Sequence, residues 1–175
     1  TYFPTAMEDV THVSFALENP DSLEGQTFDI VLYDADSNDD GLVDAYDTWS
    51  AIAAQSYVID SSMLAPNDTI LVELFSLGTA PEITLSANQA YVAMVEYNAL
   101  SAANDGLSAA PEYLHSSGIG FVEDNTFLVT NGGLSSWSAA TNAAAFVKLH
   151  TDGFEVENAT SDLKLGDTQV TLFPN

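Results

Sequence analysis

The chain has 175 residues, of which 46% are hydrophobic, so it is long and apolar enough for one domain with a sizeable core and is not a disordered polymer. Two Lys and no Arg stand against 26 Asp and Glu, and the resulting net charge of −24 repels phosphate groups and anionic lipid heads. We therefore expect no nucleic-acid binding and no membrane insertion, and the absence of Cys excludes disulfides and thiolate metal sites.

Alternation of apolar and polar residues predicts short, half-buried strands along most of the chain. In chain order, the clearest runs lie at residues 13–18, 28–33, 56–60, 70–74, 92–95, 118–123, 126–130, 144–150 and 169–173. Turn-forming Asn, Asp, Gly and Pro residues separate these runs, whereas helical patterns are scarce and residues 101–114 are expected to form a long loop. This pattern predicts an all-β fold: an antiparallel β-sandwich, jelly-roll-like, with a calcium loop inserted between two strands.

The sharpest local pattern is an acidic loop at residues 36–47 with the sequence D-S-N-D-D-G-L-V-D-A-Y-D. Oxygen ligands fall at loop positions 1, 3, 5, 7, 9 and 12, position 7 through its backbone carbonyl: Asp36, Asn38, Asp40, Leu42, Asp44 and Asp47. Gly41 at position 6 permits a sharp turn, and the apolar Val43 is expected to hold the loop against the core. Because calcium takes about six to eight oxygen ligands, we predict calcium as the cofactor. The alternative is a solvated, metal-free acidic hairpin.

These twelve residues resemble the calcium loops of dockerins and of other extracellular calcium repeats. The likeness ends at Asp47, because the residues that follow lead toward a strand and not toward a helix and a second loop. The resemblance therefore implies calcium binding and does not imply binding to a cohesin.

No pattern in the chain indicates catalysis, so we expect no enzyme. His12, His115 and His150 form no metal-ligand spacing, and neither a nucleophile elbow nor a glycine-rich phosphate loop occurs. We expect each histidine to be an exposed strand residue. Aromatic residues offer a different function, because Trp49, Tyr113 and Trp137 could stack on sugar rings, although such residues also favour half-buried positions.

The C-terminal residues Leu172-Phe173-Pro174-Asn175 resemble the opening of the type IX secretion sorting domain of Bacteroidota. Residues 10–33, 55–59 and 90–97 look like parts of the β-sandwich domains that precede that signal. The resemblance implies a secreted or outer-surface protein and no particular reaction. It also implies a β-sandwich domain at residues 1–156, followed at 157–175 by a polar linker and the start of a sorting segment.

We therefore expect a non-catalytic, calcium-binding surface or secreted domain with a structural, adhesive or extracellular-assembly role. The alternative is a carbohydrate-binding accessory module of a secreted hydrolase, with polysaccharide as its partner. For the first function, the partner considered is a second copy or another surface protein that pairs through an edge strand, and residues 11–17 are one candidate for such an edge. An end segment, residues 1–8 or 169–175, could complete the sheet of such a neighbour.

Overall fold

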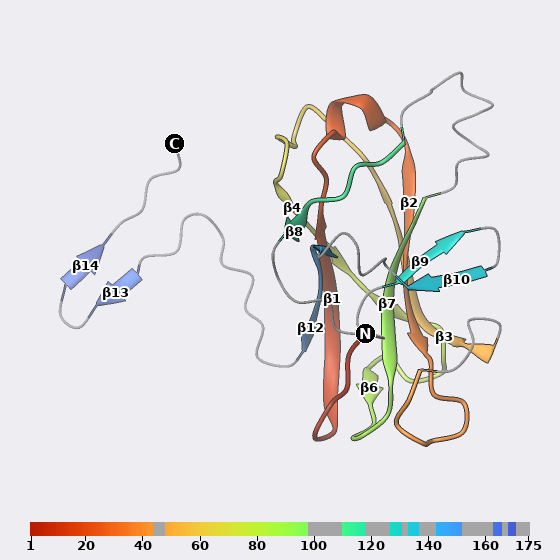
Figure 1. Cartoon of the computed structure of the whole chain (residues 1–175). Coiled ribbons are helices and arrows are strands. Elements are labelled where there is room, and N and C mark those ends of the chain that lie inside the picture. Colours follow the sequence, from red (N-terminus) through yellow and green to blue (C-terminus); the bar gives the residue numbers. More distant parts are fainter. Residues whose placement is uncertain are drawn as a thin grey trace.

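The computed structural model describes residues 1–43, 48–97, 110–117, 127–130, 133–136, 143–151, 163–165 and 168–170 (Figure 1). Its strands are β1 (Glu8–Ala16), β2 (Thr27–Asp34), β3 (Ser50–Val58), β4 (Thr69–Glu73), β5 (Phe75–Ser76), β6 (Ile83–Leu85), β7 (Tyr91–Tyr97), β8 (His115–Ser117), β9 (Phe127–Thr130), β10 (Gly133–Ser136), β11 (Ala143–Ala145), β12 (Val147–Thr151), β13 (Leu163–Leu165) and β14 (Thr168–Val170). A short 3-10 helix, Pro20–Leu23, connects β1 to β2.

Two four-stranded antiparallel sheets form the body of the molecule, and Figure 1 shows them as two layers. In the first sheet, β1 pairs with β12 on one side and with β4 and β6 on the other. The second sheet has the order β5-β3-β2-β7. The predicted all-β, antiparallel sandwich is thereby confirmed, and the jelly-roll connectivity stays a prediction.

The core lies between these sheets because each sheet turns one apolar face inward. Val13 and Phe15 of β1 and Phe28 and Ile30 of β2 are all fully buried. The rings of Phe15 and Phe28 meet across the two layers, with their centroids 5.9 Å apart. Burying each large apolar side chain contributes roughly 1.5–3 kcal/mol to the free energy of unfolding, so the period-two pattern is what selects this packing.

The position of β1 corrects one expectation, because this strand is central in its sheet and not an edge. Its neighbours on both sides use the backbone groups that residues 11–17 would need to pair with another chain. A bulge between Val10 and His12 lets Val10 and Val13 both reach the core, which a regular strand would forbid. The alternating pattern of β1 can be seen in the sequence, whereas the strands that pair with it cannot.

Strand β3 begins at Ser50, well before the predicted start at residue 56. Its first half is rich in Ala, which has a low strand propensity, so the local pattern there is weak. The hairpin with β2 extends the strand nevertheless, because β2 offers partners from Thr27 to Asp34. Pairing across the sheet thus overrides the local preference.

Three further two-stranded sheets join β9 to β10, β8 to β11 and β13 to β14. The last of these lies in the segment predicted as a linker and sorting segment, and the predicted domain boundary stays a prediction. The strand predicted at 118–123 and most of the loop predicted at 101–114 lie outside the described residues. At the N-terminus, Tyr2 exchanges two backbone hydrogen bonds with Tyr91 of β7 in the same chain.

Candidate metal site between strands β2 and β3

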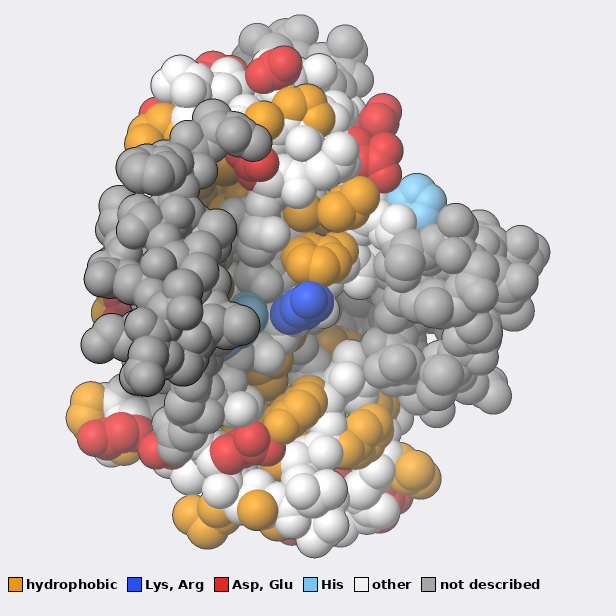
Figure 2. Space-filling view, turned by 90° about the vertical axis from the view of Figure 1, so that its left-hand side faces the viewer, with side chains coloured by type: hydrophobic (Ala, Val, Ile, Leu, Met, Phe, Trp, Pro, Cys, Tyr) orange, Lys and Arg blue, Asp and Glu red, His pale blue; other side chains and the backbone are white. Residues whose placement is uncertain are grey.

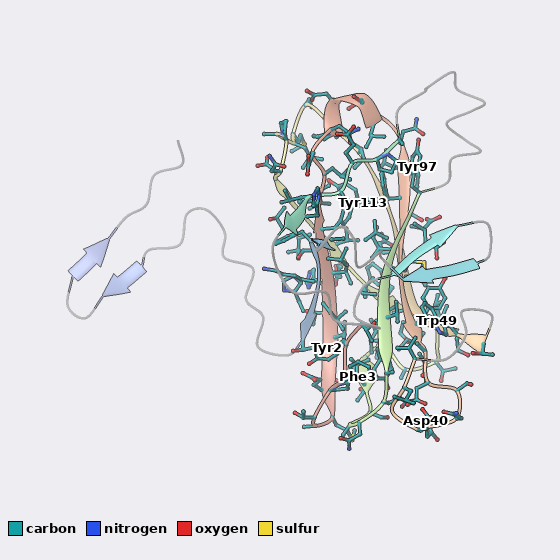
Figure 3. The ribbon with its side chains drawn as sticks, viewed as in Figure 1. Tyr2, Phe3, Asp40, Trp49, Tyr97 and Tyr113 are labelled. Atoms are coloured by element: carbon teal, nitrogen blue, oxygen red, sulfur yellow. The ribbon has the colours of Figure 1, made fainter. Side chains whose placement is uncertain are left out.

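The acidic loop connects the end of β2 at Asp34 to the start of β3 at Ser50, where the sequence predicts an insertion between strands. Figure 3 shows Asp40 at one end of the sandwich. Asp36, Asn38, Asp40 and Leu42 lie in the described part of this loop, whereas the predicted ligands Asp44 and Asp47 lie outside it.

Asp36 is the centre of the described loop. Its side chain is only 1% exposed, and its two carboxylate oxygens accept hydrogen bonds from different backbone groups. The Asp40 N–H donates to Oδ1 at 2.9 Å, and the Gly41 N–H donates to Oδ2 at 2.7 Å. The chain therefore curls around this carboxylate, as a loop with its first ligand at position 1 must do.

Asn38 and Asp40 lie on the exposed side of the same turn. The Asn38 Oδ1 accepts from the Asp40 N–H at 3.2 Å, and its amide Nδ2 donates to Asp40 Oδ2 at 3.0 Å. The Leu42 N–H donates to Asp40 Oδ1 at 2.9 Å, while the Leu42 side chain is 63% exposed and takes no part in packing the turn. Side chains at loop positions 1, 3 and 5 are thus gathered within one short turn.

The described residues complete only part of the predicted ligand set. They contain two of its four carboxylates, and among them no group of three or more His, Cys, Asp or Glu side chains could hold a metal ion. The donor chemistry of the part that is described, carboxylate and amide oxygens, suits a hard cation such as calcium.

The backbone of the turn explains why glycine occupies position 6. Gly41 has a φ of 79°, and a Cβ added there would lie 3.3 Å from the carbonyl oxygen of Asn88. Asp39, with a φ of 58°, is also left-handed, which Asp tolerates better than most residues. The loop therefore folds tightly and lies against the turn that precedes β7.

Gln89 in that turn connects the loop to the rest of the sandwich. Its Nε2 donates to Asp34 Oδ2 at 2.9 Å and to Asp39 Oδ1 at 3.4 Å, and its Oε1 accepts from the Tyr91 hydroxyl at 3.1 Å. Burial raises the pKa of Asp34, and the nearby carboxylates of Asp36 and Asp39 add to the rise, while the hydrogen bonds to Asp34 oppose it. Sequence reasoning missed Gln89, because it lies about fifty residues from the loop in a segment with no motif.

A small apolar cluster holds the other side of the loop. Ala35, Trp49 and Val92 are buried together, and Val43 packs against them, which confirms its predicted role. The ring of Trp49 lies 5.8 Å from that of Tyr33, and only 9% of the Trp49 residue is exposed. This burial corrects the sugar-stacking role considered for Trp49, because a ring packed in a core offers no face to a ligand.

The other aromatic candidates form no exposed row with Trp49 in the described structure. Tyr113 is half-buried, stands edge-on to Phe28 and donates its hydroxyl to the Val95 carbonyl at 3.4 Å. Burial raises the pKa of Tyr113 strongly, as expected for a ring inside the fold. Figure 3 shows Tyr113 and Trp49 at different levels along the sandwich, and Trp137 lies outside the described residues.

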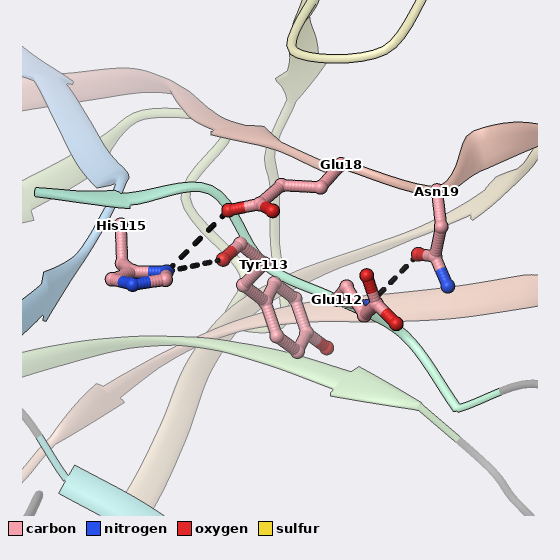
Figure 4. Close-up of polar contacts among 5 residues, drawn as sticks. All are labelled: Glu18, Asn19, Glu112, Tyr113 and His115. Carbon is pink, nitrogen blue, oxygen red and sulfur yellow. Dashed lines mark hydrogen bonds and ion pairs between the residues drawn. The ribbon is translucent and has the colours of Figure 1, made fainter.

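The three histidines occupy two different settings. His115 is exposed, and its Nδ1 lies 3.5 Å from a carboxylate oxygen of Glu18, beside the Tyr113 carbonyl (Figure 4). His12 and His150 are instead half-buried, which corrects the expectation that each histidine is exposed. They face each other across β1 and β12, a pairing that sequence spacing could not reveal.

Comparisons with protein-family models, with curated proteins and with solved structures found no match for this chain. Across the described residues, no helix has the length and hydropathy needed to cross a membrane.

Proposed function

We propose that this chain is a non-catalytic, calcium-binding β-sandwich domain of a secreted or surface-exposed protein, with a structural, adhesive or assembly role. The observation that carries the proposal is the buried Asp36 carboxylate, around which the loop places Asn38 and Asp40. With a net charge of −24, such a loop favours a divalent cation, because the cation removes repulsion among its carboxylates.

The side chains of Asp36, Asn38 and Asp40 and the carbonyl of Leu42 would hold the ion, together with Asp44 and Asp47 from the second half of the loop. Bound calcium would supply a cross-link between the two halves. Because the first half is tied to Gln89 and to the Trp49 cluster, ordering the loop would stiffen this end of the sandwich. The domain then gains stability in a calcium-rich exterior.

An assembly role is supported by the edge of the second sheet. There β5 has only two residues, and it pairs with β3 at Ala53 and Ala54. Phe75 and Leu77, at this edge, are 53% and 59% exposed. Two copies of such an acidic chain repel each other, so divalent cations would favour their association as well as the folding of the loop.

The deciding experiment is a thermal unfolding curve in EDTA and in millimolar calcium. With a Kd on the order of 10⁻⁴ M, as in extracellular calcium modules, calcium stabilises the fold by about 1.4 kcal/mol. For a domain of this size the expected rise in Tm is about 3–5 °C. The Asp40→Ala variant should lose this rise, while its Tm in EDTA stays close to that of the parent.

The matched control is Asp39→Asn, which removes one charge from the same loop at a position outside the ligand set and should keep most of the calcium response. An equal response in Asp40→Ala and the parent would place the metal elsewhere, and no response in the parent would leave the loop as a solvated hairpin. For the assembly role, sedimentation of the parent with and without calcium is the test, and a monomer under both conditions argues against it. No described aromatic favours the carbohydrate-binding alternative.

A further inference from the structure

Two of the three histidines of this chain face each other on neighbouring strands, away from the acidic loop. We propose that His12 and His150 form a two-imidazole site for a divalent metal ion of the Zn²⁺, Ni²⁺ or Cu²⁺ class. These ions prefer imidazole nitrogen, whereas calcium prefers oxygen, so this site and the proposed calcium loop would select different metals.

The sheet register places the two imidazoles together. His12 of β1 is directly opposite His150 of β12, and the next pair along, Val13 and Leu149, points into the core. The two histidines therefore project together from the outer face of the first sheet. Directly opposed residues have Cβ atoms about 4.5–5.5 Å apart, a spacing from which two imidazoles can converge on one ion.

The β-bulge at Thr11 directs the His12 side chain to the outer face of the sheet. It shifts the register between Val10 and His12, so that His12 faces outward although Val10, two residues earlier, is buried in the core. Bulges re-aim side chains in this way and are frequent beside functional sites. Without it, either Val10 would leave the core or His12 would enter it.

A neighbouring hydroxyl orients one of the rings. The Nε2 of His150 lies 2.8 Å from Oγ of Ser14, a residue that is only 1% exposed. In the tautomer in which Nε2 donates to this hydroxyl, Nδ1 of His150 keeps its lone pair. Imidazoles that bind metals commonly have their second nitrogen held in this manner.

Two charged side chains lie near the proposed site, Lys148 opposite Ser14 and Glu73 opposite His12. Lys148 opposes a cation, but its Nζ lies over the Phe146 ring, 4.6 Å from the centroid. On the other side of His12, Glu73 of β4 stands in the same row and contributes a negative charge.

The site offers two protein ligands. No third His, Cys, Asp or Glu joins them within the part of the chain that the structure describes. Water molecules could complete the coordination of the ion. Figure 2 shows the face on which the Lys side chain, in blue, lies among hydrophobic and uncharged side chains, with acidic groups toward the margins. A cation here is thus bound by imidazole nitrogen and not by a cluster of carboxylates.

The unmodified chain provides the first test, because its three histidines give three sets of ring signals in a long-range ¹H–¹⁵N NMR spectrum. Zn²⁺ is added in excess calcium, which occupies carboxylate sites. We expect the His12 and His150 rings to shift together and the His115 ring to stay in place. Equal shifts of all three rings, or none, would overturn the proposal without requiring any variant to fold.

Zn²⁺ titration calorimetry of three single variants gives the second test. His12→Gln and His150→Gln each remove one of the two ligands, so each should weaken binding by more than the roughly tenfold loss that follows from removing an outer-shell partner. His115→Gln is the matched control and should bind as the parent does, as should Asp40→Ala, which alters only the calcium loop. Parent-like affinity in both His12→Gln and His150→Gln would refute the site.

Discussion

Gly41 and Asp36 together determine the shape of the acidic loop. The first supplies a left-handed backbone that most residues resist, and the second supplies a buried acceptor for two backbone donors. A buried carboxylate without a cation would be costly, but here the two N–H groups and the adjacent turn satisfy it. Replacing either Gly41 or Asp36 should therefore disturb the turn of the loop.

Replacing Gly41 by Ala should destabilise the protein for two separable reasons. A φ of 79° costs an L-residue roughly 1–2 kcal/mol, and the new Cβ would press on the Asn88 carbonyl oxygen at 3.3 Å. Gly25→Ala is the matched control, because Gly25 has a φ of 72° and no atom within 4 Å of the added Cβ. Urea unfolding should show the larger loss for Gly41→Ala, and equal losses would show that the Asn88 contact relaxes freely.

The protonation of His150 should make the free energy of unfolding depend on pH. In the unfolded chain a histidine binds its proton near pH 6.5, whereas burial and neighbouring positive charge lower the pKa of His150 in the fold. As the pH falls through about 6.5, the unfolded state takes up this proton first, so the free energy of unfolding decreases until the folded pKa is passed. Urea unfolding in EDTA from pH 7.5 to 5.5, at about half-unit steps, measures this decline.

The matched variants for this measurement are His150→Gln, which should flatten the decline, and His115→Gln, which should keep the part due to His150. A parent whose stability is constant over the interval would contradict the prediction. EDTA removes bound metal, so the result reports the proton alone.

At the scale of elements, the β2–β3 loop depends on the turn between β6 and β7. Gln89 hydrogen-bonds Asp34 and Asp39 at once, and the Ala35 N–H donates to the Ala90 carbonyl at 3.0 Å. Sequence-distant segments thus position the loop before any ion binds. This arrangement makes Gln89 a positioning residue for the proposed calcium site, because it touches carboxylates that flank the ligands.

Gln89→Ala should therefore weaken calcium binding by roughly tenfold, the lower end of the range for residues that orient ligands. Calcium titration calorimetry measures the change, with Gln55→Ala on the exposed part of β3 as the control that should leave the affinity unchanged. An unaltered affinity in Gln89→Ala would show that the loop orders itself without this turn.

For the whole molecule, a charge of −24 with two Lys means that ion pairs contribute little to the fold. The aromatic and aliphatic side chains buried between the sheets must therefore stabilise the fold by more than the repulsion among carboxylates destabilises it. Such a molecule should depend on salt in a way that a balanced domain does not.

We expect the Tm in EDTA to rise as sodium chloride increases from about 10 mM to about 500 mM, because the Debye length falls from roughly 30 Å to a few Å. Choline chloride should produce a similar rise, since screening does not depend on the identity of the cation. A Tm that does not change with the concentration of either salt would show that the carboxylates are too far apart to interact.

The sequence determined the fold class, because period-two alternation can bury an apolar face only in a sheet, and the core residues of β1 and β2 follow that alternation. It also located the acidic loop and the role of Val43, since the loop spacing is local in the chain. The central place of β1, the early start of β3 and the burial of Trp49 were decided by tertiary structure. Each of these three features depends on partners far along the chain. The same is true of the contact between Gln89 and Asp34 and of the pairing of His12 with His150. Strand pairing joins residues whose separation no local sequence pattern encodes.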